Sequence, residues 1–358
     1  MRVYNVEIFE RDFSLVQHYN VSDITYAFDY LSTVENLVTL PYDPAVRIGQ
    51  YIRITGGALE YFGIISAVST AAALDGYAEL RYKPFLSVFD QQILFDTDLQ
   101  GSVITLEQMI ANQITDGWIS SADSSQNIPG LEVETTSSTS GWGFHLTSDV
   151  EGMHKCVINF QTVILMRALT KYRVACVVIP DIQAQTITVS IGVPAADPVT
   201  IETDLPSVLS KNILLLETNQ TVNKVVVYDK SDMVTSLTYY LHPDGSYDTT
   251  DSNRITPVKQ TVKLAEAGDG ETFADAAYTA AGQDLSKMEY RNLVELAVLN
   301  EDRLAADPSL VIGGEVQILS NGTPLTSILT AVEYGRTTKL TFGAIRVDLT
   351  QIIKRSTT

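Results

Sequence analysis

The stretch VRIGQYIRITGGALEYFGIISAV, from Val46 to Val68, has a counterpart near the other end of the chain, LVIGGEVQILSNGTPLTSILTAV, from Leu310 to Val332. The two stretches align without a gap, and the Ile-Gly pair that ends at Gly49 matches the pair that ends at Gly313. One chain therefore carries the same pattern twice. The apolar residues that match in order are Ile52 with Val316, Ile54 with Ile318, Ile64 with Ile328, Ile65 with Leu329, and Val68 with Val332.

Each copy is typical of strands joined by tight turns. The segments YIRI and EVQI have the alternation of a half-buried strand. Gly56-Gly57 and Asn321-Gly322 follow them, and these residues tolerate the positive φ of hairpin turns. Both copies then continue into a third strand, AELRY from Ala78 and TKLTF from Thr338. Two unrelated β-meanders would share some of this alternation by chance, but the ordered match of glycine and apolar positions favours an internal duplication.

Length and charge narrow the class of protein. The 358 residues are enough for about two to four domains, and 45% of them are hydrophobic, as in ordinary globular proteins. The formal net charge is −19, which argues against binding nucleic acid through phosphate contacts, because such contacts need a basic surface. This acidity fits a solvated surface, or a cavity that should not retain a polyanion.

Neither the N-terminus nor the cysteines indicate export. The first residues, MRVYNVEIFERD, carry charges where a signal peptide needs apolar residues, and no stretch approaches the ~20 apolar residues that span a bilayer. We therefore expect a soluble protein made in a cytoplasm, or one exported by a route that the sequence does not show. Cys156 and Cys176 lie in apolar contexts and do not make a disulfide scaffold, so buried free thiols are expected.

Four regions are expected along the chain. Residues 1–89 predict a first β-barrel module, residues 90–211 an α/β middle domain, and residues 212–291 a β–α segment. Residues 292–358 predict the second β-barrel module, together with part of 212–291. The predicted fold class is α+β, mainly β, with two related small β-barrel modules flanking an α/β middle region.

Helices are expected at three places. The first runs from Thr105, a suitable N-cap, to Ile119, and its apolar residues recur at helical spacing. The others are Asn159–Tyr172 and an alanine-rich helix that begins near Thr272 and ends near Gly282 or a little beyond. The segments VACVVIP and TITVSIGV flank a turn and predict a hairpin, and NLVELAVL predicts a strand despite its leucines.

Signatures of metal binding and of common catalysis are missing from the sequence. It has no G-x-S-x-G elbow, no phosphate-binding loop and no G-x-G-x-x-G after a strand. His145, His154 and Cys156 lie near one another in sequence, but their spacing matches no structural zinc pattern. We therefore expect no metal ion.

Two weaker patterns concern calcium and carbohydrate. The segment HPDGSYDTTDSN carries Asp244, Asp248 and Asp251 without the ligand order of a calcium loop, so a hydrated turn is expected. Glu132 and Glu134 resemble a glycosidase pair, but such pairs arise freely among 43 acidic residues. Three aromatic residues of the middle region either line a sugar-binding face or fill small cores, which is the more ordinary role. They are Trp118, Trp142 and Phe144.

The two β modules resemble those of the gp27-like baseplate hub, or tail-tip hub, proteins of tailed phages and related contractile injection systems. The resemblance is closest to the version that forms the N-terminal part of siphophage tail-associated proteins. It rests on residues 24–68 and 292–343, because family members are similar in carrying an Ile-Gly turn, alternating strands and a second glycine in both places. Residues 90–211 are similar only in being α/β.

The resemblance implies a structural protein of the virion. Such hubs are homotrimers, so three chains with two related modules each would form a pseudo-sixfold face that docks on the sixfold tail tube, opposite a threefold tip. A channel for genome passage is implied, with no enzymatic activity, catalytic residue or cofactor. The implied partners are the tail tube or distal tail protein, the tape measure protein and a central spike or fibre protein. Assembly in the host cytoplasm and residence at the virion's tail tip are implied.

Two other functions stay open from the sequence. One is a cell-wall-degrading tail enzyme, which predicts carboxylates or a histidine converging in a cleft. The other is a carbohydrate-binding tail adhesin, which predicts exposed aromatic side chains, with Trp118 and Trp142 as first candidates. Because the sequence ends at Thr358, soon after the second module, we expect no attached lytic, fibre or spike domain.

Overall fold

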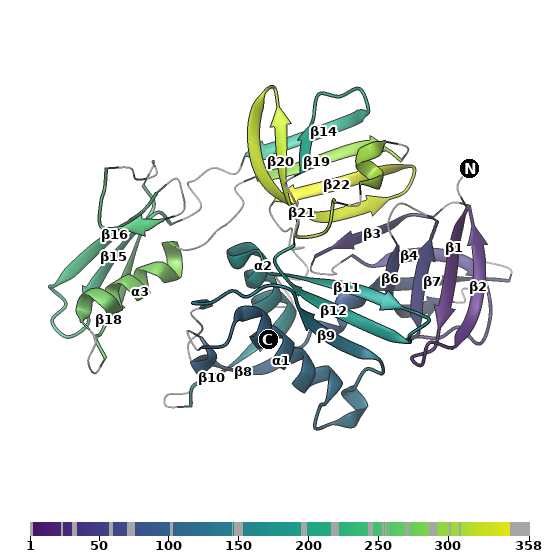
Figure 1. Cartoon of the computed structure of the whole chain (residues 1–358), viewed down its shortest axis with the longest axis horizontal. Coiled ribbons are helices and arrows are strands. Elements are labelled where there is room, and N and C mark those ends of the chain that lie inside the picture. The colour runs from purple at the N-terminus through teal and green to yellow at the C-terminus, as the bar shows by residue number, and fades with distance from the viewer. Residues whose placement is uncertain are drawn as a thin grey trace. The chain divides into compact units, whose positions relative to one another are not determined.

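The computed structural model describes residues 3–22, 24–30, 34–56, 60–69, 76–100, 103–144, 146, 153–194, 199–215, 222–242, 246–252, 254, 256, 258–268, 272–285, 292–300, 302–307 and 309–343. Two compact units are present (Figure 1). The larger comprises Met1–Ile213 with Leu293–Thr358, and the smaller comprises Leu214–Asn292. Within the described ranges, no helix is long and apolar enough to cross a membrane.

The first module is a six-stranded sheet in the order β2-β1-β5-β6-β7-β4. Neighbouring strands are antiparallel throughout. In β4, buried and exposed residues alternate strictly, as expected for a sheet with one face on a core. The strands are β1 (Tyr4–Phe9), β2 (Leu15–Val21), β4 (Asn36–Pro41), β5 (Tyr51–Thr55), β6 (Tyr61–Ser69) and β7 (Tyr77–Pro84).

The second module is a seven-stranded sheet that draws on three distant parts of the chain. Its order is β13-β20-β21-β22-β19-β14, and β3 (Tyr26–Asp29) pairs with β21 beside this path. Residues 199–211, which the sequence analysis assigned to the middle domain, therefore lie mostly in this sheet. The remaining strands are β13 (Val199–Glu202), β14 (Val208–Leu215), β19 (Asn292–Leu299), β20 (Glu315–Ser320), β21 (Thr323–Tyr334) and β22 (Thr337–Gly343).

Four strands of each module have the same order, so the predicted internal duplication is confirmed for them. The path β5-β6-β7-β4 of the first sheet corresponds to β20-β21-β22-β19 of the second, with every neighbour antiparallel. The flanking strands differ, because β1 pairs with β5 antiparallel whereas β13 pairs with β20 in parallel. The duplication therefore covers the four-strand unit and leaves out the strands beside it.

The same irregularity recurs at matched positions of the two modules. The register of β6 against β7 shifts between Ile65 and Ala67, and that of β21 against β22 shifts between Leu329 and Ala331. A β-bulge of this kind bends and twists a strand locally. Both strands thus bend at the same point of the repeated pattern.

The turn before each bulged strand is also the same. Gly49 has φ +88° and Gly313 has φ +85°, a conformation that favours glycine. The Gly49 N–H donates to the Ile65 carbonyl at 2.9 Å, and the Gly313 N–H donates to the Leu329 carbonyl at 2.8 Å. The repeated Ile-Gly motif is therefore the tight turn that ties each copy to its own bulge.

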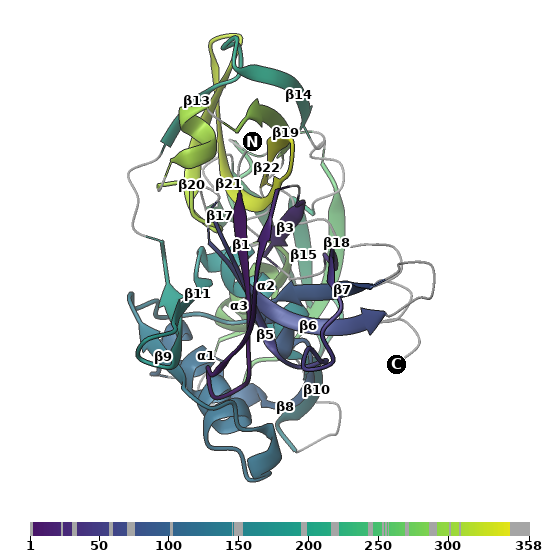
Figure 2. The ribbon, with the colours of Figure 1, turned by 90° about the vertical axis from the view of Figure 1, so that its right-hand side faces the viewer.

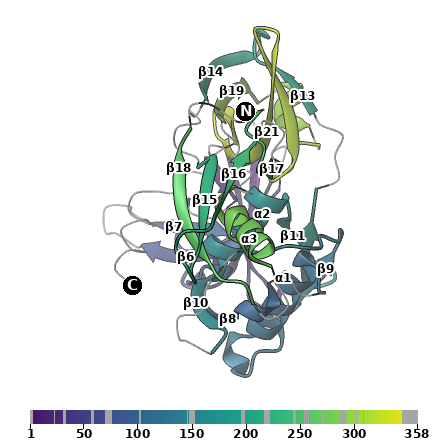
Figure 3. The ribbon, with the colours of Figure 1, turned by 90° about the vertical axis from the view of Figure 1, so that its left-hand side faces the viewer.

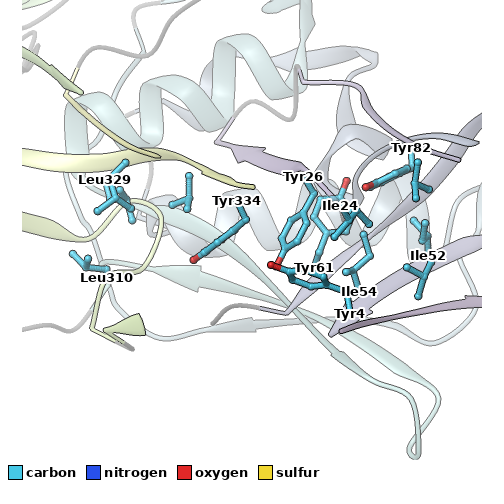
Figure 4. Packing of buried hydrophobic residues seen from close by; sticks show 14 of the residues in the cluster. Tyr4, Ile24, Tyr26, Ile52, Ile54, Tyr61, Tyr82, Leu310, Leu329 and Tyr334 are labelled. Atoms are coloured by element: carbon cyan, nitrogen blue, oxygen red, sulfur yellow. The ribbon is translucent and has the colours of Figure 1, made fainter. Parts of the chain in front are cut away.

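One hydrophobic core joins the two modules. Tyr26 of β3 packs 5.7 Å from Tyr61 of the first sheet and 5.2 Å from Tyr334 of the second, measured between ring centroids. Figure 4 shows Tyr26 and Tyr61 together, with Tyr334 on the side of the second module. Matched residues of both copies, among them Ile54 and Ile318, are fully buried in this core. The modules consequently fold as parts of one unit.

The middle region carries two small sheets and two helical segments. β8 and β10 pair antiparallel, while β11, β12 and β9 form a three-stranded sheet in which β9 is parallel to β12. α1 lies against β9 and β12. The elements are η1 (Phe85–Phe89), β8 (Gln92–Asp96), η2 (Thr97–Leu99), α1 (Leu106–Ile114), η3 (Thr115–Ile119), η4 (Ser124–Gln126), β9 (Leu131–Thr135), β10 (Lys155–Asn159), η5 (Phe160–Leu165), α2 (Met166–Tyr172), β11 (Ala175–Asp181) and β12 (Thr186–Gly192).

The predicted helices and hairpin of this region are confirmed. Thr105 caps α1 by accepting a hydrogen bond from the Gln108 N–H at 3.2 Å. Asn159 caps the second helical segment by accepting from the Thr162 N–H at 2.9 Å. The strands β11 and β12 form the expected antiparallel hairpin.

The smaller unit is a four-stranded sheet with one covering helix. The strand order is β17-β16-β15-β18, and α3 lies across this sheet (Figure 3). The predicted helix is confirmed over Phe273–Leu285, and Thr272 and Asp275 cap its first turn reciprocally. Its end at Leu285 agrees with the predicted end near Gly282 or a little beyond. The strands are β15 (Lys224–Asp229), β16 (Ser236–Leu241), β17 (Tyr247–Asp248) and β18 (Gln260–Ala265).

Candidate functional site

The histidine and cysteine residues considered for zinc have different surroundings. His154 is exposed and its Nδ1 lies 3.0 Å from Asp98 Oδ1, while Cys156 is buried. His145 lies outside the described residues. Among the described residues, no three or more His, Cys, Asp or Glu side chains gather where they could hold a metal ion.

The carboxylates considered for calcium face different partners. Asp248 Oδ1 lies 3.0 Å from His242 Nε2 and accepts a hydrogen bond from the Thr250 N–H at 2.6 Å. Asp251 pairs with Arg254 at 2.9 Å, and Asp244 lies outside the described residues. Both described carboxylates are exposed, and Asp248 belongs to the short strand β17, where the sequence predicted a turn.

The candidate glycosidase pair lies on an open strand. Glu132 and Glu134 both project from the exposed side of β9. A glycosidase needs its two carboxyl groups on opposite sides of the scissile bond in a sugar-binding site. Two carboxylates two residues apart on one exposed strand face do not provide that arrangement.

The aromatic residues considered for sugar binding are buried. The Trp118 ring packs 4.9 Å from Phe89 and 5.4 Å from Phe160, again between centroids. Trp142 is 1% exposed, its ring packs at a tilt 5.5 Å from that of Phe144, and its Nε1 donates to the Ile104 carbonyl at 2.9 Å. These side chains fill cores, so the exposed aromatic face that an adhesin would need does not come from them.

A buried carboxylate fixes the polar loop that follows β9. Glu107 of α1 is fully buried and accepts hydrogen bonds from Ser137 Oγ at 2.5 Å, from the Thr139 N–H at 2.8 Å and from Thr139 Oγ1 at 2.8 Å. Burial alone would raise the pKa of Glu107, but these hydrogen bonds outweigh it and hold the pKa below its ordinary value. Sequence reasoning does not identify this role of Glu107, because nothing local to Glu107 predicts that a distant loop covers it.

The sheet of the second module carries a groove. It has a volume of about 540 Å³ and lies over β19, β21 and β22, with β3 on one side and β14 on the other. Glu333 pairs with Lys339 at 3.0 Å across its floor, and Asn212 donates to Glu295 at 2.9 Å. The groove therefore offers paired polar groups beside the apolar side chains of Phe28 and Val34.

No family model matches the chain, and no curated protein matches it. Several solved structures are similar to it. The tail protein of Neisseria meningitidis MC58 shares 12% identity and a TM-score of 0.53, over 95% of this chain and 96% of that one. The 43 kDa tail protein of prophage MuSo2 from Shewanella oneidensis shares 12% identity and a TM-score of 0.52, over 95% and 98%.

A third similar structure comes from a baseplate. A chain of the phage P2 baseplate in its activated conformation with Ca shares 10% identity and a TM-score of 0.50, over 96% of this chain and 98% of that one. The fold is that of phage tail and baseplate hub proteins, which confirms the resemblance and the mainly β fold class that the sequence predicted. At these identities the likeness concerns the fold.

Proposed function

We propose that this chain is a structural virion protein, a trimeric baseplate or tail-tip hub. The observation that carries the proposal is the duplicated four-strand unit, with its matched glycine turns and bulges, in a chain that has the tail-protein fold. Three copies with two related modules each present six similar units to a sixfold partner while keeping threefold symmetry elsewhere. The hub would thereby adapt the tail tube to a threefold tip and surround a channel for the genome.

The proposal includes the partner proteins of the hub and its location in the virion. The tail tube or distal tail protein and the tape measure protein would meet the pseudo-sixfold face, and a spike or fibre protein the threefold face. The hub's parts follow the predicted regions 1–89, 90–211, 212–291 and 292–358, except that β13 and β14 join residues 199–211 to the second module. Assembly takes place in the host cytoplasm, and the mature location is the virion's tail tip.

Oligomeric state tests this proposal directly. Sedimentation or mass photometry of the purified chain, together with cryo-EM of assembled tails, is expected to give a trimer, either free in solution or formed only in the tail. A dimer, or one isolated chain in the assembled tail, contradicts the proposal.

A second experiment tests for enzymatic activity. Peptidoglycan zymography and a peptidase panel are expected to show no turnover. Reproducible turnover abolished by one carboxylate or histidine substitution would support the enzyme instead.

A further inference from the structure

The two Ile-Gly turns of the duplicated pattern have different cover. Gly313, just before β20, is buried, and a Cβ added there would lie 2.8 Å from the side chain of Ala175 in β11 and 3.1 Å from that of Leu169 in α2 (Figure 2). Gly49 is partly exposed. Within the described part of the chain, only the Arg11 side chain comes within 4 Å of a Cβ added at Gly49. The middle region therefore covers the turn of the second module and leaves that of the first without such a cover.

The isoleucine beside each glycine shows the same contrast. Ile312 is partly buried and packs against the core that both modules share, whereas Ile48 is 65% exposed. A single exposed apolar side chain is ordinary on a protein surface. The duplication supplies a comparison here, because the same motif in the same backbone conformation is covered in one module and exposed in the other. We therefore call Ile312–Gly313 the covered turn and Ile48–Gly49 the bare turn.

The bare turn is held in one conformation by the buried side chain of Gln50. Its Nε2 donates to the Ala45 carbonyl and to Glu10 Oε1, each at 2.9 Å, and its Oε1 accepts from the Arg47 N–H at 2.8 Å. Glu10 also pairs with the Arg47 guanidinium at 2.7 Å. A surface that is ordered before binding loses less conformational entropy on association, so this ordered protrusion of Ile48 suits recognition by a partner.

Charge indicates what a cover for the bare turn must carry. The covered turn is joined to the middle region by an ion pair, in which Arg173 Nη1 lies 3.2 Å from Glu315 Oε2. At the bare turn the cation belongs to the module itself. Arg11 donates from Nε to the Gly49 carbonyl at 2.7 Å and lies over the Tyr51 ring, and no carboxylate pairs with it among the residues that the structure describes. A cover would satisfy the remaining N–H donors of Arg11 with a carboxylate, which reverses the charges found at the covered turn.

We propose that the bare turn is a docking site for a different protein of the tail, whose apolar side chains enclose Ile48 and whose carboxylate pairs with Arg11. A second copy of this chain lacks a suitable cover, because each chain has two such turns and one middle region, and Gly313 already occupies the covering surface of that region. The inference rests on the proposed trimeric hub and deepens it. A ring of three chains would carry three bare turns, so this partner would bind at three sites although six similar modules are present.

Thiol labelling of free and assembled protein tests the site. Ile48→Cys adds one exposed thiol to a chain whose two natural cysteines are buried. A thiol-reactive disulfide reagent should label it rapidly in the purified chain, whether single or trimeric, and at least about tenfold more slowly in assembled tails. Leu94→Cys, at a side chain of β8 that is 61% exposed, is the matched control for exclusion of the reagent by the tail as a whole.

A charge series and a cross-link test the chemistry of the partner. Arg11→Glu brings like charges together, so its share of finished tails should fall at least about tenfold in competition with the unmodified chain, whereas Arg11→Lys keeps the charge and should lose far less. Arg336→Glu makes the same change of net charge at another exposed position and is the control. A photoreactive reagent on the Ile48→Cys thiol should give, in assembled tails, a cross-link to a peptide of another protein that contains Asp or Glu.

Each outcome bears on a different statement. Equal labelling of Ile48→Cys in free protein and in assembled tails overturns the docking site, while the trimeric hub stands. Protection already present in the single chain shows that the chain covers its own turn, and protection that begins in the homotrimer identifies a second copy; either result overturns the proposal. A chain that stays single in assembled tails overturns the hub and this inference with it. Should Leu94→Cys be protected as well, the cross-link decides, and a cross-link to this chain alone is a contradiction.

Discussion

At the scale of single residues, Glu107 is the most deeply buried carboxylate in the part of the chain that the structure describes. Its carboxylate is fully buried, and its hydrogen-bond donors, Ser137 and Thr139, come from a loop that the sequence indicates only as polar and irregular. A buried carboxylate without donors is strongly unfavourable, so the loop and the helix stabilise each other. The polar composition of that loop is thus a structural requirement of α1.

Replacing Glu107 should lower stability in a pH-dependent way. Glu107→Gln brings an amide N–H₂ group toward existing donors, and it should cost roughly 1–3 kcal/mol of unfolding free energy at neutral pH. Because the folded-state pKa of Glu107 is lowered, its ionised form stabilises the fold above the unfolded pKa, and this contribution is lost as pH falls through the folded pKa. Urea titrations at several pH values should show the deficit shrinking in acid.

The exposed Glu132 is the matched control for this prediction. Glu132→Gln changes the same chemical group on the open face of β9 and should stay within about 0.5 kcal/mol of the unmodified protein. Equal effects of the two substitutions would show that the hydrogen bonds to Glu107 contribute nothing specific.

The buried thiol of Cys176 should be unreactive in the folded protein. Burial raises the pKa of this thiol to about 12, so the nucleophilic thiolate is scarce at ordinary pH. Cys156 is also buried. A thiol-reactive disulfide reagent at pH 8 should therefore label neither cysteine in native buffer and both in urea. Rapid labelling of the native protein would contradict the buried placement.

At the scale of elements, the two Ile-Gly turns have the same backbone and different surroundings. A Cβ added at Gly49 meets only the side chain of Arg11, at 3.6 Å. A Cβ added at Gly313 meets the Ala175 side chain at 2.8 Å and the Leu169 side chain at 3.1 Å. The second turn is therefore packed against the middle region, whereas the first has room.

Alanine substitution should separate backbone strain from packing at these turns. Gly49→Ala should cost about 1–2 kcal/mol from positive φ alone. Gly313→Ala should cost the same strain plus about 1–3 kcal/mol for overpacking. Thermal or urea unfolding of the two variants measures the difference directly. Similar losses of unfolding free energy at both positions would mean that Ala175 and Leu169 shift at little cost to accommodate the added methyl group.

At the scale of the whole molecule, the net charge of −19 would give the proposed ring of three chains a large combined negative charge. We expect some of it to line the proposed channel. An acidic wall repels the phosphate backbone over about a Debye length, ~8 Å at physiological salt, which keeps the passing polymer off the surface. A basic wall would bind phosphates through counterion release and slow the transit.

A reconstruction of the assembled ring tests this expectation. Channel-facing side chains should be predominantly acidic or neutral, and the purified protein should not retain duplex DNA at physiological salt. Predominance of Lys and Arg in the channel would contradict the expectation that the wall repels DNA, and it would leave the proposed hub function unaffected. Ordinary solvation of the outer surface is the alternative source of the acidity.

The sequence by itself determined the elements whose signals are local. The helix from Thr105, the helical segment after Asn159 and the hairpin of β11 and β12 all appear where periodicity and capping residues predict them. The duplication could also be predicted from the sequence. The Ile-Gly turn requires a glycine because its φ is positive, and apolar and polar residues must alternate in each strand that buries one face. These requirements act within about ten residues, so they leave a trace in the sequence.

Only the tertiary structure decided which distant segments complete each sheet. β3 pairs with β21, and β13 and β14 join the second sheet, although each is far from its partners in sequence. Strand partners are chosen by burial and backbone pairing across the fold, and a short apolar strand fits several edges equally well. The burial of Glu107 has the same origin, since it depends on which remote segment covers that part of α1.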